Sequence, residues 1–246
     1  MQTLSAGSMM GRKPRKVPIT TDPDFASVVF LADFEGAHQD TSYTEQSSNA
    51  TALTFISNAE LNNTRPGFGS TALELDGAAS WVQLASPEDL STQPFTIECT
   101  VQLDSLAAFP MFTSVFNETS NERSWYWGYL SGSMYFGFSP DGINTNFVSR
   151  TWSAATSTTY QLCVTRDVDT LAFYVDGTRL GTTIDVSSAI YDTYAASIAP
   201  LRIGSAQGAS DFDVDGMLDD VRLTFGVARY GTGTSYTLPT GPFPTS

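Results

Sequence analysis

From Val28 to its C-terminus, the chain consists of short apolar stretches separated by Gly, Asn, Asp, Ser and Pro. In residues 95–103 every second side chain is apolar, which is the pattern of a strand with one buried face. Helix patterns are almost absent: 86–90 could form one capped turn, and 185–198 is ambiguous, a loop with one turn of helix. Many strands at regular spacing predict a β-sandwich or barrel.

The hairpin signal in this stretch is Asp176-Gly177, which joins two alternating runs. Asp-Gly in that setting favours a two-residue turn. The expected strands are 27–34, 51–57, 71–75, 80–84, 94–103, 111–116, 125–130, 133–138, 146–150, 159–166, 170–175, 178–184, 199–203 and 217–225.

The strand-rich region has no composition break, so we expect one domain over 27–246 with a proline-rich tail, preceded by an extended arm over 1–26. A hydrophobic share of 41% supplies a sizeable core. The charged share of 15% is too low for a coiled coil. No apolar run approaches the roughly 20 residues of a membrane span.

Charge divides the chain into two parts. The arm carries Arg12, Lys13, Arg15 and Lys16 with no acid before position 22, while the rest holds 8 basic and 26 acidic residues. An acidic body repels nucleic acid and anionic membranes, so neither is an expected partner. We interpret the arm as an anchor for an acidic protein surface; the alternatives are contact of the arm with nucleic acid or an anionic membrane, and a solvated tail. Its basic cluster is not followed by the apolar stretch of a secretory signal.

The two cysteines lie on predicted strands. Cys99 falls on the apolar face of 95–103, whereas Cys163 faces away from Leu162 and Val164. Thiols on opposite sides of a sheet cannot bridge, so we expect two free cysteines.

A series of short motifs resembles one family. They are Phe34-Glu-Gly36, the run from Gly67 to Gly77, Trp81-Val-Gln-Leu84, Phe95-Thr-Ile-Glu98, Leu171-Ala-Phe-Tyr-Val-Asp-Gly177, Leu201-Arg-Ile-Gly204 and the run from Gly216 to Leu223. In this order they resemble the laminin-G-like branch of the concanavalin A-like lectin/glucanase superfamily. The resemblance implies an all-β jelly-roll sandwich of two antiparallel sheets.

Two longer segments are more specific. Residues 22–36 and 219–230 are similar to the beginning and end of such domains in tailed-phage virion proteins. The resemblance implies a virion protein assembled in the host cytoplasm, with capsid or tail proteins as partners. Since symmetric assembly hides edge strands, we also expect a homo-oligomer.

Enzymes of the superfamily use a Glu-x-Asp-x-(x)-Glu pattern, and a retaining mechanism needs two facing carboxylates about 5 Å apart. The chain lacks that pattern, and Glu98 is the one carboxylate in its strand. His38, the single histidine, lies in a polar loop region and suggests no triad. We therefore expect no enzyme.

The resemblance implies a calcium site between the first and last strands. Asp219 matches the aspartate that opens the last strand, with Asp33 or the carbonyls near Gly36 at the other end. Carboxylates and carbonyls suit calcium. The alternatives are solvated acids, or pairing of Asp219 with Arg222 at the strand end.

Aromatic residues suggest a carbohydrate site. Trp125, Trp127 and Tyr129 share one face of a predicted strand, and Trp152 follows in the chain. Exposed aromatic faces stack on sugars, although such residues are more often core. The leading hypothesis is a non-enzymatic virion protein, decorating the capsid or belonging to the tail, that contacts host-surface glycans. The alternatives are a carbohydrate-binding adhesin module and, disfavoured by the missing carboxylates, a glucan-cleaving hydrolase.

Overall fold

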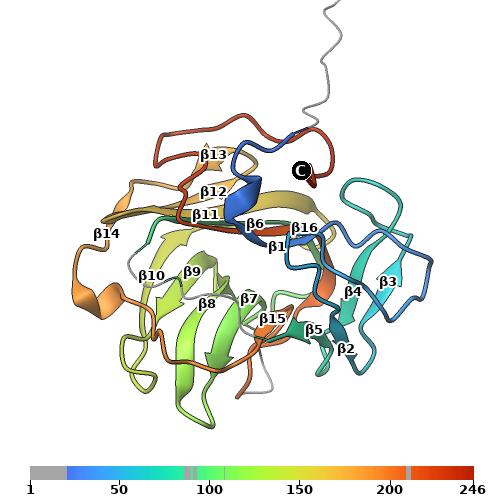
Figure 1. The fold of residues 1–246 in the computed structure, drawn as a ribbon, viewed down its shortest axis with the longest axis horizontal. Coiled ribbons are helices and arrows are strands. Elements are labelled where there is room, and N and C mark those ends of the chain that lie inside the picture. The colour runs from blue at the N-terminus through green and yellow to red at the C-terminus, as the bar shows by residue number, and fades with distance from the viewer. Residues whose placement is uncertain (1–20, 86–89, 91–92, 108, 209–211) are drawn as a thin grey trace, which may run out of the picture.

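The computed structural model describes residues 21–85, 90, 93–107, 109–208 and 212–246. These residues form two antiparallel sheets packed face to face, as Figure 1 shows, so the expected β-sandwich is confirmed. The basic side chains of the predicted arm, and most of the predicted turn at 86–90, lie outside the described residues.

One sheet has nine strands in the order β13-β12-β11-β6-β16-β4-β3, with β1 on β16 and β14 on β12. Their bounds are β1 Val28–Ala32, β3 Glu60–Asn62, β4 Ala72–Asp76, β6 Phe95–Leu103, β11 Thr159–Asp167, β12 Thr170–Val175, β13 Thr178–Arg179, β14 Ile184–Asp185 and β16 Asp215–Phe225.

The other sheet has seven strands in the order β10-β9-β8-β7-β15-β5-β2. Their bounds are β2 Thr54–Ile56, β5 Trp81–Leu84, β7 Met111–Asn117, β8 Glu122–Leu130, β9 Ser133–Phe138, β10 Asn146–Thr151 and β15 Leu201–Ile203. The strand β3 was not expected. The strand expected over 178–184 is interrupted, and its two ends appear as β13 and β14.

The described residues also contain two 3-10 helices: η1 (Phe25–Ser27) precedes β1, and η2 (Ala189–Tyr191) lies between β14 and β15. The helix η2 confirms the turn expected within 185–198. The helix η1 and the buried Asp22 show that residues 22–27 lie against the sandwich, so the N-terminal part of the body begins before position 27. No helix within the described ranges has the length and apolar character needed to cross a membrane.

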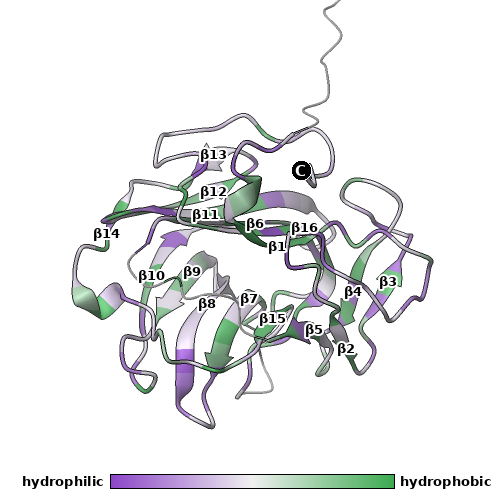
Figure 2. Ribbon diagram, in the orientation of Figure 1, coloured by the Kyte–Doolittle hydropathy of each residue, from purple (hydrophilic) through white to green (hydrophobic). Residues whose placement is uncertain are grey.

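The alternating residues become the core between the sheets. Phe95 on β6 stacks on Phe136 of β9, with ring centroids 5.2 Å apart, and so joins the two layers. Figure 2 shows hydrophobic residues along the strands where the sheets face each other. Burial of this alternating face is what stabilises the sandwich.

The Asp-Gly hairpin is confirmed between β12 and β13. Asp176 and Gly177 both have positive φ, 48° and 71°. Two such residues in succession suit the type I′ turn, which glycine adopts without steric penalty.

Both cysteines are free and buried, as expected. Cys99 packs in the core between the sheets, whereas Cys163 packs on the outer side of the nine-stranded sheet against Tyr230 and Tyr236. The sheet backbone therefore separates the two thiols.

Candidate functional site

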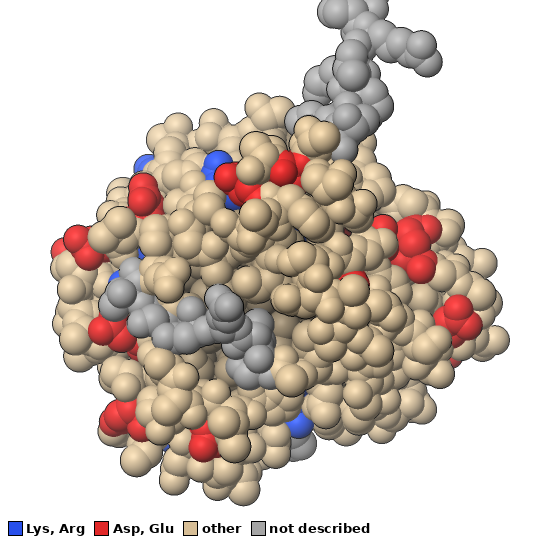
Figure 3. Space-filling model, viewed as in Figure 1, with Lys and Arg blue, Asp and Glu red and all other residues tan. Residues whose placement is uncertain are grey.

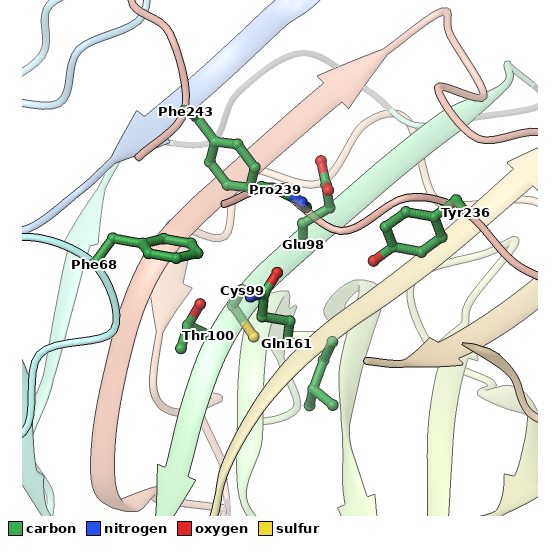
Figure 4. A pocket seen from close by; sticks show the side chains of 9 residues that line it. Phe68, Glu98, Cys99, Thr100, Gln161, Tyr236, Pro239 and Phe243 are labelled. Atoms are coloured by element: carbon green, nitrogen blue, oxygen red, sulfur yellow. The ribbon is translucent and has the colours of Figure 1, made fainter. Parts of the chain in front are cut away.

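The outer face of the nine-stranded sheet is covered by the ends of the described chain. The C-terminal segment crosses β6 and β11, and Figure 4 shows Tyr236, Pro239 and Phe243 above the sheet. The backbone N–H of Asp22 donates to the carbonyl of Ser246 at 2.7 Å. This cover leaves only a narrow space, so the face is not open to a large ligand.

A buried ionic network lies beneath this cover. Arg222 donates to Glu98 from Nε (2.9 Å) and Nη2 (2.7 Å), and pairs with Asp22 at 3.2 Å. The Tyr230 hydroxyl donates a hydrogen bond to Glu98 at 2.6 Å, and Arg229 forms an ion pair with Asp22 at 2.8 Å. Burial lowers the pKa of Arg222, but Glu98, Tyr230 and Asp22 together outweigh this and hold the pKa above its ordinary value. Glu98 is therefore committed to structure.

The acids predicted to hold calcium lie near one another, but their oxygens already have partners. Asp219 accepts the backbone N–H groups of Gly67 (2.7 Å) and Asp220 (2.9 Å). Asp33 accepts the Tyr43 hydroxyl at 2.6 Å and the amide of Gln46 at 3.0 Å. These two carboxylates hold loops in place.

Gly36, the third predicted calcium residue, donates its backbone N–H to the Thr71 hydroxyl at 2.9 Å. A methyl group at Gly36 would lie 2.6 Å from the Leu61 side chain, so the backbone passes close to β3 here. Its amide stabilises the loop, as Asp219 and Asp33 do.

Sequence reasoning missed Asp220. It lies at the irregularity of β16 between Asp219 and Arg222, has a φ of 47° and is 2% exposed. Neither carboxylate oxygen accepts a hydrogen bond of normal geometry, and the N–H of Phe68 only moderates its pKa. Burial and the charge of Asp33 raise that pKa to about 7. The Asp-Asp pair was visible in the sequence, but the strand irregularity that turns the second residue inward was not.

The orphaned oxygens of Asp220 are the observation that fits a cation at this position. Burial, followed by the charge of Asp220, also raises the pKa of Asp219 to about 9. Within the described residues, however, no group of three His, Cys, Asp or Glu side chains is arranged to hold a metal. Calcium bound here would need Asp220 together with backbone carbonyls and water to complete its six to eight oxygens.

The aromatic residues predicted to bind sugar lie in the core. Trp125, Trp127, Tyr129 and Trp152 are 2%, 0%, 5% and 6% exposed. Trp127 packs edge-on against Phe112 at 5.3 Å. A ring enclosed between two sheets has no free face for a sugar, so this assignment is corrected: the shared face was identified, but it points inward.

The opposite face of β8 carries a different set of aromatics. The register aligns Arg202, Ser114, Tyr126, Gly137 and Phe147 across five neighbouring strands of the seven-stranded sheet. Residues directly opposite in antiparallel strands share a face. Since the flanking residues point into the core, this row lies on the outer face of the sheet.

The aromatic residues of this outer face form one connected patch, which we call the outer aromatic patch. It consists of Phe109, Tyr126, Tyr135, Phe147 and Phe212. Phe109 is central, with centroids 5.8 Å from Tyr126, 5.8 Å from Tyr135 and 5.7 Å from Phe212. Phe147 is 56% exposed and lies 5.3 Å from Tyr135.

Gly137 lets the patch lie flat on the sheet. A methyl group at this position would come within 2.1 Å of the Tyr126 ring, so the ring lies directly over the glycine. The ring is largely buried, and burial raises the pKa of the Tyr126 hydroxyl to about 12. Tyr126 is therefore the floor of the patch, and Tyr135 and Phe147 are its more accessible edge.

The family model of the concanavalin A-like lectin/glucanases superfamily matches residues 76–226, more than half of the chain. Comparison with curated proteins finds no match.

Several solved structures share the fold. The binding domain of Paraclostridial Mosquitocidal Protein 1 has 12% identity and a TM-score of 0.63, and the match covers 81% of this chain and 49% of that chain. Domain 4 of AbnA, an extracellular arabinanase from Geobacillus stearothermophilus in complex with arabinotriose, has 13% identity and a TM-score of 0.60, with 81% and 93% covered. The botulinum neurotoxin serotype D/C binding domain has 12% identity and a TM-score of 0.61, with 81% and 49% covered. The chain thus spans about half the length of two of these structures, and the likeness concerns the fold.

Proposed function

Because the chain belongs to the concanavalin A-like lectin/glucanases superfamily, we propose that it is a non-catalytic module that binds glycans. The outer aromatic patch is the observation that carries this proposal. On the sheet face opposite the chain termini, it presents the exposed ring of Phe147 and the half-buried ring of Tyr135, which rest on the buried ring of Tyr126 and adjoin the half-buried Phe109 and Phe212. Aromatic rings stack on the C–H faces of sugars, and a rigid sheet holds them at little entropic cost.

The environment of Glu98 supports a non-catalytic role. This carboxylate is 2% exposed and bound by Arg222 and Tyr230. A carboxylate held in this way cannot attack a sugar or exchange protons with it, because it has no free approach to substrate. Domain 4 of AbnA, whose structure was solved with arabinotriose, provides a precedent for a saccharide on this fold.

The test is a glycan array followed by calorimetry with the best ligand. The double variant Tyr135→Ala, Phe147→Ala should weaken binding at least tenfold, because it removes two aromatic rings on which a ligand ring can stack. Such stacking on an aromatic side chain contributes roughly 1–3 kcal/mol. Val168→Ala is the matched control: Val168 is 54% exposed but lies in the turn between β11 and β12 of the other sheet. Equal binding by the double variant, or no glycan bound at all, would refute the proposal.

We also propose a biological setting: the protein is displayed on a tailed-phage virion, to which its basic arm anchors it. The similarity of 22–36 and 219–230 to virion domains supports it. Since Asp22 is buried against the sandwich, deletion should stop at position 20. We expect the truncated protein to fold, to form the same homo-oligomer and to lose its place on particles. Full decoration by the truncated form would contradict the anchor.

A calcium ion at Asp220 is a further part of the proposal. Its two unpartnered oxygens support it, and the family implies such an ion. When bound, calcium would offset the buried charge and fix the middle of β16 next to the C-terminal end of β1. It would thereby stabilise the module rather than take part in chemistry.

A further inference from the structure

Arg202 is a buried cation without a counter-ion among the described residues. It lies on β15 between Leu201 and Ile203, which point into the core, so its own side chain lies on the outer face of the seven-stranded sheet. Arg202 is 8% exposed. The other two buried arginines, Arg166 and Arg222, each face a carboxylate. Buried charges are normally paired, so this difference calls for an explanation.

The guanidinium of Arg202 is held in place but makes few hydrogen bonds. Its carbon lies 4.3 Å above the Trp81 ring, and Nη2 donates to the Gln207 side chain at 3.0 Å. Nε has no partner, and no other side-chain hydrogen bond of this guanidinium occurs within the described residues. A guanidinium has five N–H groups in a planar fork, and the fork matches a carboxylate.

Nearby acids do not fill this role. Asp213 is the carboxylate whose charge acts on Arg202, but its oxygens accept from Ser205 at 2.5 Å and from the backbone of Ala79 at 2.8 Å. Burial lowers the pKa of Arg202, as expected for a cation that lacks a close anion. Among the described residues, Arg202 therefore has no carboxylate in direct contact with its guanidinium.

The surroundings of Arg202 favour a sugar. Trp81 donates its indole N–H to Gln83 at 3.0 Å, which fixes the ring, and Gln83 lies directly opposite Arg202 in the register. Glutamine amides both donate and accept, as sugar hydroxyls do. From Arg202 the same row continues through Ser114 to Tyr126 of the outer aromatic patch.

We propose that Arg202 anchors a subsite for a carboxylated saccharide. The guanidinium would take the carboxylate, and Trp81 and the outer aromatic patch would take the sugar rings. This inference rests on the proposed glycan-binding function and names its ligand class. On the face of the protein shown in Figure 3, most residues are uncharged, and acidic side chains are more prominent than basic ones. Selection of an anion therefore has to come from this local site and not from the overall charge of −14.

The experiment compares ligands that differ only in the carboxylate. Calorimetry and saturation-transfer NMR would use trigalacturonate against its methyl ester, and sialyllactose against its methyl ester. We expect the wild type to prefer a carboxylated form. Arg202→Gln should lower that affinity roughly tenfold or more, with the ester or neutral form unaffected. Arg202→Lys should retain only part of the preference, because an ammonium lacks the planar fork.

The control is Arg65→Gln, which changes the net charge by the same amount at an exposed ion pair with Asp104. It should bind like the wild type. Thermal unfolding of Arg202→Gln confirms that the variant is folded.

The subsite is refuted if the wild type binds carboxylated and esterified ligands with equal affinity, or if Arg202→Gln binds carboxylated ligands as tightly as the wild type does. If neutral sugars still bind in that case, the proposed function survives. If no saccharide binds, the proposed function and the subsite fall together. Equally tight binding of a tetraglutamate peptide overturns the saccharide assignment.

Discussion

Replacing Arg222 with methionine would remove the cation at the centre of the buried network and leave its acids in place. Arg222 is 4% exposed and donates to Glu98 and Asp22. Asp22 would keep Arg229 as a partner, but Glu98 would retain only the hydroxyl of Tyr230. The main penalty is therefore one buried carboxylate without a counter-charge.

Breaking a buried ion pair on one side costs about 3–5 kcal/mol. For a domain of this size, each kcal/mol lowers Tm by roughly 2–4 °C, so Arg222→Met should unfold at least about 6 °C earlier. Urea denaturation provides the free energy of unfolding, and an unchanged m-value would show that the folded state keeps its compactness.

Arg202→Met is the matched control, because Arg202 is also buried but has no carboxylate partner among the described residues. Methionine there leaves no orphaned anion, so we expect a loss of no more than about 1 kcal/mol, or a gain. If Arg222→Met costs less than about 1 kcal/mol, or if the two variants are equally unstable, the argument from paired and unpaired buried charge is refuted.

Three more predictions concern other parts of the molecule. Trp127→Ala should cost about 3–5 kcal/mol of stability through cavity formation but leave the glycan affinity of the folded protein unchanged; loss of binding at constant Tm would speak against its core position. Millimolar calcium should raise the Tm of the wild type but not that of Asp220→Asn, and equal shifts in both would place the ion elsewhere. Despite the opposing effect of burial, the hydrogen bond from Arg229 holds the pKa of Asp22 below 3.8. The contribution of ionised Asp22 to stability is thus present above that pH and lost as the pH falls further. Asp22→Asn should therefore flatten the decline of Tm below pH 4, and a decline as steep as that of the wild type would contradict this.

Local pattern predicted the strands and their faces correctly in many places. The alternation in 95–103 became β6, and the Asp-Gly pair became the turn between β12 and β13. The opposite sides of Cys99 and Cys163 also followed from the period of two. These features depend on neighbouring residues alone, so one sequence contains enough information to predict them.

The functional face could not be predicted in the same way. The sequence placed Trp125 and Trp127 on one side of a strand and Tyr126 on the other. Which side is buried depends on where the second sheet packs, and the two tryptophans point toward it. The calcium prediction named Asp219 but not its neighbour Asp220, because the irregularity of β16 changes which side chain turns inward.

The sequence by itself determined the strand-rich sandwich, the acidic body, the free thiols and the shared face of each alternating run. All of these follow from interactions between residues that are near in the chain or from simple composition. The tertiary structure alone decided which faces are covered, which acids are left without partners, and that Arg202 is buried beside Trp81. Those properties arise when segments distant in sequence exclude water from one another, and burial, unlike alternation, is not a local property of the chain.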